Sequence, residues 1–127
     1  MHVLIITDRE ADLKWISEPM NATGFAVNII KAYSMDEVIR LIAAIKFDII
    51  MYDIGFSKDA LRDNLRKISV MGCKAPLIVL TDNSGDISVK EALQSGADYH
   101  LVKGQQNFAA IAESFRSLLS KNSFHYN

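Results

Sequence analysis

The sequence is poor in the residues that crosslink small secreted proteins and in long apolar runs. Its single cysteine, Cys73, excludes an internal disulfide and any metal site built from several cysteines. No apolar run approaches the roughly 20 residues that cross a bilayer, and no basic residues precede the short run HVLIIT at 2–7, as they would in a signal peptide. We therefore expect a cytoplasmic protein with no membrane contact, in which Cys73 is a small apolar residue near a turn.

An excess of charge of either sign is also absent. The chain has 14 Lys and Arg against 15 Asp and Glu, a formal net charge of −1. Domains that bind nucleic acid usually carry a basic surface, so we expect no nucleic-acid contact through this chain. Neither G-x-G-x-x-G nor G-x-x-x-x-G-K-[ST] occurs, and TDREAD at 7–12 contains no glycine. A nucleotide or flavin site would need such a phosphate loop, so this class of function has little support.

What the chain does have is a hydrophobic pattern that changes period repeatedly. Short runs rich in β-branched residues predict buried strands, and apolar residues three or four positions apart predict amphipathic helices. The predicted strands are 2–7, 24–30, 47–53, 75–81 and 98–103, and the predicted helices are 9–20, 34–46, 57–72, 84–96 and 105–120. We expect one domain over residues 1–120, followed by a tail or the start of a linker at 121–127.

Local signals refine the predicted helices. Ser34 followed by Glu37 is a capping-box pattern, and Gly72 and Gly96 are typical of residues that end a helix. Pro19 predicts a kink or an early end of the first helix, because a helix interior tolerates proline poorly. The predicted core faces of the second and third helices are Met35, Val38, Ile39, Ile42 and Ile45, and Leu61, Leu65 and Ile68.

Strands that alternate with helices predict a parallel sheet covered on both faces. Right-handed crossovers leave few topologies, among them the doubly wound, flavodoxin-like order 2-1-3-4-5. In that order the first and third strands are neighbours at the switch point. Ligands of such folds bind beyond the carboxyl ends of the strands, so the residues at those ends are the candidates for a site.

Five polar residues stand at the carboxyl ends of the predicted strands. They are Thr7 and Asp8 after the first strand, Asp53 after the third, Thr81 after the fourth and Lys103 after the fifth. Carboxylates suit Mg²⁺, which prefers oxygen ligands, and a hydroxyl and an ammonium suit phosphoryl oxygens. Their convergence on one edge favours a site that moves phosphate onto or off a carboxylate.

Each of these residues also has a purely structural interpretation. Thr7 with Glu10 forms a T-x-x-E pattern that is typical of a helix start, and Asp53 is compatible with an ordinary turn. Thr81 is a common strand residue, and Lys103 is compatible with a surface position. It is the combination at one sheet edge that favours function.

The same segments resemble the receiver domain of two-component response regulators, in a chemotaxis-receiver-like form. The matching pieces are VLIITD, FDIIMYD, APLIVLT and SGADYHLVKG, in the family's order and over essentially the whole chain. The resemblance implies a flavodoxin-like fold. It also implies phosphoryl transfer from a sensor histidine kinase or a phosphotransfer protein to an aspartate at the end of the third strand, with Mg²⁺ bound.

The resemblance assigns six residues. They are Asp53 as phospho-acceptor, Asp8 and the Gly55 backbone carbonyl as further Mg²⁺ ligands, Thr81 and Lys103 as contacts of the phosphoryl oxygens, and Thr81 with His100 as switch residues. A hydrogen-bonded strand histidine is the alternative for His100. Catalysis would be at most self-catalysed phosphorylation and dephosphorylation at Asp53. The face formed by 84–96, 98–103 and 105–120 would bind a downstream protein, an output domain or a second copy of the chain.

The chain departs from the family at several positions. Thr7 replaces the first of two adjacent acids, so we expect weak Mg²⁺ binding. Gly104 follows Lys103 where the family has a proline, and a cis bond before a non-proline costs about 2.5–4 kcal/mol, so we expect a trans bond. The usual methionine–proline pair is absent after Asp53, and Asp82 follows Thr81 where a small residue is usual. The alternative function is therefore a degenerate receiver that acts as a phosphorylation-independent interaction or dimerisation module.

Overall fold

The computed structural model describes residues 1–8, 14–22, 24, 26–56, 58–71, 74–82, 87–102, 113, 116 and 117. Within them, five parallel strands form one sheet in the order β2-β1-β3-β4-β5. The strands are β1 (His2–Ile6), β2 (Asn28–Ala32), β3 (Ile49–Asp53), β4 (Leu77–Thr81) and β5 (Tyr99–Val102). The predicted flavodoxin-like topology is therefore confirmed, with β1 and β3 side by side at the switch point.

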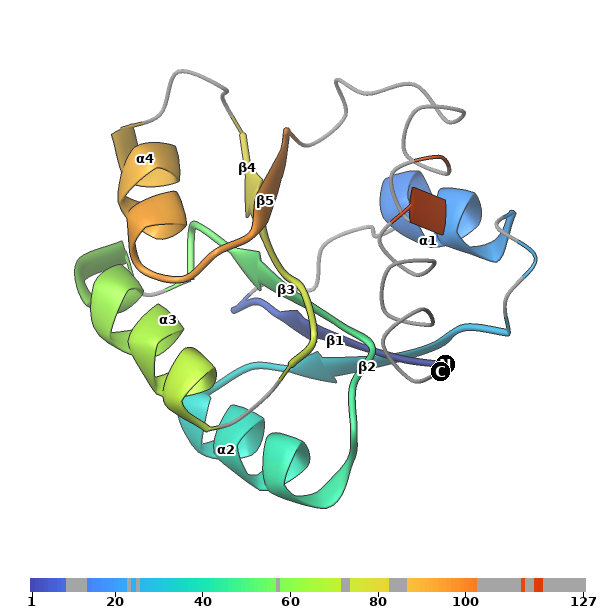
Figure 1. Ribbon diagram of the computed structural model, residues 1–127, viewed down its shortest axis with the longest axis horizontal. Helices are drawn as coiled ribbons and strands as arrows, with labels where there is room; N and C mark the ends of the chain where they lie inside the picture. Colours follow the sequence, from blue (N-terminus) through green and yellow to red (C-terminus); the bar gives the residue numbers. More distant parts are fainter. Residues whose placement is uncertain are drawn as a thin grey trace.

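Helices cover both faces of this sheet. They are α1 (Lys14–Asn21), α2 (Met35–Ala44), the short 3₁₀ helix η1 (Lys58–Ala60), α3 (Leu61–Val70) and α4 (Ile87–Gln94). Helices α2, α3 and α4 lie on one face, and α1 lies on the other (Figure 1). No helix in the described part of the chain has the length and apolar character of a membrane span.

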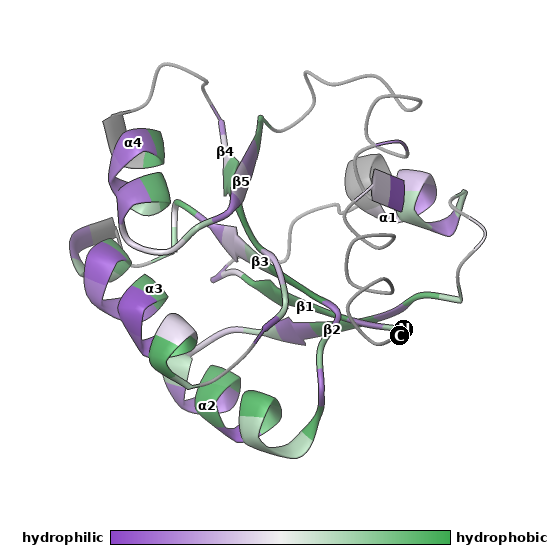
Figure 2. Ribbon diagram, viewed as in Figure 1, coloured by the Kyte–Doolittle hydropathy of each residue, from purple (hydrophilic) through white to green (hydrophobic). Residues whose placement is uncertain are grey.

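The alternation of side chains along the strands divides the core into two layers. Ile50 and Tyr52 of β3 pack with the α2–α4 side, whereas Ile49 and Met51 pack with the α1 side near Met20. These four of the five β3 residues are fully buried, as the sequence predicted. Figure 2 shows hydrophobic residues within the strands, interrupted by hydrophilic ones in β2 and β5, and a hydrophilic outer side of α3. Burial on both faces holds β3 rigidly, which fixes the position of the acid at its end.

The second strand begins later than predicted. The sequence predicted 24–30, but β2 runs from Asn28 to Ala32 because it pairs in register with β1 from His2 to Ile6. The Met1 carbonyl accepts a hydrogen bond of 2.8 Å from the Asn28 amide, which marks the start of the pairing. Apolar patterning does not reveal where a partner strand begins, so the prediction was misplaced by four residues at its start.

The helix signals are confirmed with two qualifications. The Glu37 amide donates a 3.2 Å hydrogen bond to Ser34 Oγ, so Ser34 is the N-cap of α2. Ile39, predicted on the core face of α2, is 42% exposed. Pro19 lies inside α1, which ends at Asn21 shortly after it.

Gly96 follows α4, as its predicted role as a helix-ending residue requires. Its φ of +120° lies in a region that residues with a Cβ rarely adopt, and a Cβ there would lie 2.5 Å from Ser69 Oγ of α3. Gly72, Cys73, the tail 121–127 and most of the predicted helix 105–120 fall outside the described residues. Within that last range the structure describes Glu113, Arg116 and Ser117, which have helical backbone.

Candidate functional site

The carboxyl ends of β1, β3 and β4 bring the predicted polar residues to one edge of the sheet. Asp53 is the last residue of β3 and is 5% exposed. Thr7 directly follows β1, whose residue Ile6 pairs with Tyr52. Thr81 ends β4 one residue beyond Leu80, which pairs with Asp53. Asp8 is exposed beside the buried Thr7. Lys103 and Gly104 lie outside the described residues.

The carboxylate of Asp53 is held by a donor on each oxygen. Thr7 Oγ1 donates to Oδ2 over 3.3 Å, and the backbone N–H of Gly55 donates to Oδ1 over 3.0 Å. Hydrogen bonds to a charged acceptor are stronger than those between neutral groups. The two contacts therefore stabilise and orient a carboxylate that is almost fully buried. Glu10, the partner of Thr7 in the predicted T-x-x-E helix start, lies outside the described residues.

A tight turn follows Asp53 and carries Gly55. The Phe56 amide donates to the Asp53 carbonyl over 2.8 Å, and the Ile54 amide donates to the Leu80 carbonyl over 2.8 Å. The phenol of Tyr52 donates to the Phe56 carbonyl over 2.9 Å. The turn is thus bonded to its own strand and to β4, which keeps the Gly55 backbone beside the Asp53 carboxylate.

Two buried polar residues next to this turn were not predicted from the sequence. Asn64 on α3 donates from Nδ2 to Tyr52 Oη over 2.9 Å, and Asn64 is only 4% exposed. A signal for this pair was available: Asn64 lies on the apolar stripe of α3, between Leu61 and Ile68, where a polar residue needs a buried partner. The strand tyrosine just before Asp53 supplies that partner.

The phenol of Tyr52 reports on the electrostatics of the pocket. Burial raises the pKa of Tyr52 above 10.0, and the nearby carboxylates of Asp53 and Asp8 raise it further, against an opposing effect of the hydrogen bond from Asn64. Tyr52 therefore stays protonated at neutral pH and acts as a donor. The charges of Asp53 and Asp8 thus both act on this phenol at the edge of the sheet.

The donor set suits a cation that demands few protein ligands. Within the described residues no three His, Cys, Asp or Glu side chains gather in a group that would hold a metal ion. Mg²⁺ is commonly bound through one or two carboxylates and several waters. The carboxylates of Asp8 and Asp53, with a backbone carbonyl from Gly55, fit that requirement. The chemistry of these donors is thus compatible with Mg²⁺ and offers little to a metal that needs nitrogen or sulfur.

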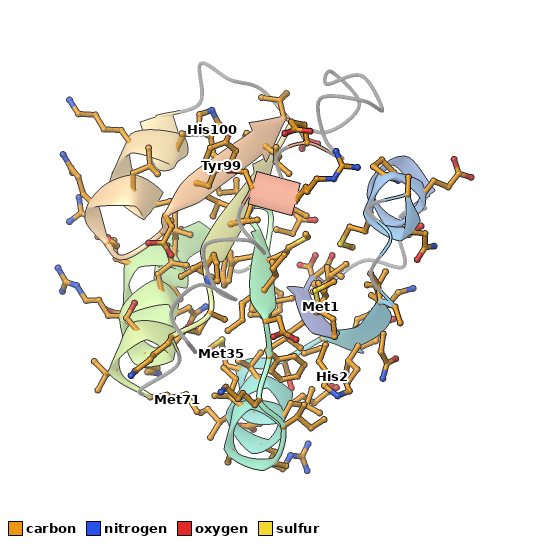
Figure 3. The ribbon with its side chains drawn as sticks, turned by 45° about the vertical axis from the view of Figure 1, so that its right-hand side comes forward. Met1, His2, Met35, Met71, Tyr99 and His100 are labelled. Atoms are coloured by element: carbon orange, nitrogen blue, oxygen red, sulfur yellow. The ribbon has the colours of Figure 1, made fainter. Side chains whose placement is uncertain are left out.

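His100 lies farther from the strand ends than the other candidates. It pairs with Val79, two residues before Thr81, and is half-buried. Tyr99 and His100 are neighbours along β5, with ring centroids 6.5 Å apart (Figure 3). Asp82, which departs from the family pattern, is exposed. The structure thus separates His100 from the carboxylates and keeps it on the edge strand.

An open groove of about 480 Å³ lies elsewhere, between α2 and α3. Its lining residues are Ile39, Asp63, Arg66, Lys67, Val70 and Met71. None of these is a candidate site residue. The polar groups at the sheet edge therefore locate the candidate functional site, and the space between α2 and α3 does not.

Comparison with known proteins agrees with the fold. The sequence matches the family model of the response regulator receiver domain over residues 3–115. No curated protein sequence gives a significant match. A two-component response regulator from Clostridium difficile is similar in structure, with a TM-score of 0.78 and 24% identity over 96% of this chain and 98% of that one.

Two orphan regulators are also similar in structure. An orphan response regulator of H. pylori has a TM-score of 0.72 and 22% identity, covering 94% of this chain and 96% of its own. An atypical orphan response regulator described as having a phosphorylation-independent regulatory mechanism has a TM-score of 0.71 and 22% identity, with the same coverage of 94% and 96%. At these identities the likeness of all three structures concerns the fold.

Proposed function

The chain belongs to the response regulator receiver family, and we propose that it accepts a phosphoryl group on Asp53. The donor would be a sensor histidine kinase or a phosphotransfer protein. The observation that carries the proposal is the setting of Asp53. Its carboxylate stands at the end of a buried central strand with a hydrogen-bond donor on each oxygen, and Asp8 lies just beyond the end of the neighbouring strand β1.

In the proposed reaction an oxygen of Asp53 attacks the phosphorus of the donor. The new O–P bond forms as the bond between phosphorus and the donor nitrogen breaks, and that nitrogen leaves with the electron pair. Receiver domains generally bind Mg²⁺, which supplies positive charge to the transferring group. Asp8, Asp53 and the Gly55 carbonyl would hold the ion in this chain. Thr81 and Lys103 would contact the phosphoryl oxygens, Thr81 as a hydroxyl donor and Lys103 as a cation.

Incubation with acetyl phosphate and Mg²⁺, followed by intact mass measurement, tests this function. We expect a mass increase of one phosphoryl group, which Asp53→Asn abolishes because an amide is a poor nucleophile. A protein that gains no adduct, under conditions in which a control receiver does, would refute the proposal. Asp59→Asn is a suitable matched variant, since Asp59 is an exposed acid of η1 and should leave the adduct unchanged.

The proposed output is a change on the face that includes α4 and β5. Phosphorylation adds about −1.5 to −2 charges at Asp53. Thr81 would turn toward the new phosphoryl group, and α4 and β5, with His100, would shift between two arrangements. Leu93 on α4 and Tyr99 on β5 are 43% and 44% exposed, which supports contact with a downstream protein or a second copy there.

A second candidate function is a phosphorylation-independent interaction or dimerisation module. Thr7 favours it, because one carboxylate fewer weakens the attraction for Mg²⁺. The described mechanism of the atypical orphan regulator offers a precedent. A Mg²⁺ titration separates the two functions. Millimolar binding that is lost in Asp8→Asn supports the phospho-acceptor, whereas a wild-type protein that binds no Mg²⁺ supports the module.

A further inference from the structure

A directional chain of hydrogen bonds connects α3 to the turn after Asp53. Asn64 Nδ2 donates to Tyr52 Oη, and Tyr52 Oη donates to the Phe56 carbonyl, each over 2.9 Å. A carbonyl oxygen only accepts, so the one proton of the phenol is used on Phe56. The Asn64 contact must then be a donation from its amide nitrogen. The direction of the chain is therefore fixed by chemistry.

This chain of hydrogen bonds holds the turn at Phe56, where both the amide and the carbonyl are bonded. The Phe56 amide is bonded to the Asp53 carbonyl over 2.8 Å, and its carbonyl is bonded to Tyr52. The rings of Tyr52 and Phe56 also meet edge to face, with centroids 5.6 Å apart. Between the two fixed residues lies Gly55, whose amide contacts Asp53 Oδ1. Any movement of Phe56 would therefore move the Gly55 backbone relative to the Asp53 carboxylate.

The local sequence makes an external anchor necessary. The turn Ile54–Gly55–Phe56 contains a glycine and no proline, so its backbone has many accessible conformations. Tyr52 is fully buried and Asn64 is 4% exposed, so each must keep its partner or leave a buried polar group unpaired. A buried polar pair of this kind specifies one geometry more strongly than apolar contacts do.

We propose that Tyr52 and Asn64 are positioning residues for the phospho-acceptor site. The hydrogen-bond chain from Asn64 through Tyr52 to Phe56 holds the turn in the geometry that keeps the Gly55 backbone beside Asp53. It thereby sets the affinity of the pocket for Mg²⁺ and the rate of phosphorylation. Neither side chain touches the reacting group. The part of this inference that concerns Mg²⁺ and phosphorylation rests on the proposed function, whereas the part that concerns the turn does not.

Amide hydrogen exchange in the metal-free protein tests the turn directly. Tyr52→Phe removes the hydroxyl and keeps the ring, so we expect the Gly55 and Phe56 amides to exchange about 2- to 10-fold faster, the usual weight of one hydrogen bond. The Met51 amide in the middle of β3 should be unchanged. An equal acceleration at all three amides, or no acceleration, would show that the pair only stabilises the fold and would overturn the inference.

Two further variants test the hydrogen-bond chain that runs from Asn64 through Tyr52 to Phe56. Asn64→Asp replaces the donor by an acceptor, which draws the phenol proton away from Phe56, so it should reproduce the effect of Tyr52→Phe on Gly55 and Phe56. Tyr52→Phe with Asn64→Leu removes both polar groups and leaves no unpaired amide, which guards against a single variant that fails to fold. Tyr33→Phe is the matched control, because Tyr33 is 40% exposed and should change nothing.

The functional readouts separate this inference from the proposed function. With Tyr52→Phe we expect the Kd for Mg²⁺ to rise about 2- to 10-fold and the rate of adduct formation from acetyl phosphate to fall about 2- to 10-fold, with Asp53 still modified. A wild-type protein that gains no adduct, together with faster local exchange in Tyr52→Phe, refutes the function and supports the positioning of the turn. A normal adduct in the wild type, with unchanged exchange, Kd and rate in Tyr52→Phe, refutes the positioning and supports the function.

Discussion

Replacing Thr7 by aspartate tests how a second carboxylate next to Asp53 affects the stability of the protein. Thr7 is 2% exposed, and its hydroxyl lies 3.3 Å from Asp53 Oδ2. A carboxylate in its place would face the Asp53 carboxylate at about 4 Å, where two unit charges repel by about 4 kcal/mol at an effective dielectric constant of 20. Water near the exposed Asp8 will reduce this, so we expect Thr7→Asp to destabilise the metal-free protein by about 2–4 kcal/mol and to lower Tm by roughly 10 °C.

The same repulsion should raise the affinity of the Thr7→Asp protein for Mg²⁺, because binding of the ion relieves it. If the ion relieves a third of the repulsion of about 4 kcal/mol between the two carboxylates, the affinity for Mg²⁺ rises about tenfold, because about 1.4 kcal/mol corresponds to a factor of ten. Urea unfolding with and without millimolar Mg²⁺ measures both effects. Thr7→Asn is the matched control, since it keeps the size of aspartate and adds no charge. A Thr7→Asp protein as stable as Thr7→Asn without Mg²⁺, and no more responsive to it, would refute the reasoning.

Three other outcomes follow from single contacts. Gly96→Ala should destabilise by about 1–3 kcal/mol in urea unfolding, because it forces an alanine to φ +120° and against Ser69 Oγ; an unchanged midpoint would contradict this. Ser34→Ala should cost about 1 kcal/mol in the same assay through loss of the bond from the Glu37 amide, and Ser34→Asp should keep most of the stability. Because the pKa of folded Tyr52 is raised above 10.0, the folded state keeps its proton longer than the unfolded state. Wild-type stability should therefore be complete below about pH 10 and fall above it more steeply than that of Tyr52→Phe; parallel curves would refute the shift.

The fold was predictable because its signals are local and repeated. Each strand is a short apolar run, and Ser34 and Gly96 mark helix ends by chemistry that depends on one or two residues. The start of β2 was misplaced because strand pairing is a long-range property: Asn28 begins the strand only because His2 begins its partner. Propensity within 24–30 carries no information about that partner.

The position of the candidate residues at one sheet edge was predictable, and the hydrogen bonds that surround Asp53 were not. The carboxyl-end rule for parallel sheets was enough to select Asp53, Asp8 and Thr81. Tyr52 and Asn64 were missed because their pairing spans the loop between β3 and α3, and because a tyrosine in a strand is normally read as core. The polar Asn64 on an apolar helix stripe was the visible anomaly, and only the fold shows that it points to the turn after Asp53.

The site has one acid fewer than the family pattern implies, and a neutral hydrogen-bond donor stands in its place. A pocket with two acids after β1 and a third at the end of β3 is electrostatically strained until a cation enters. Here Thr7 turns one of those repulsions into a donated hydrogen bond on Asp53, and the chain from Asn64 fixes the turn without a metal. The metal-free state is thereby stabilised, so we expect Mg²⁺ to have less strain to relieve and to bind more weakly. The charge at position 7 is thus the quantity on which the two candidate functions depend, since it sets whether the pocket needs a cation before Asp53 is held in a reactive geometry.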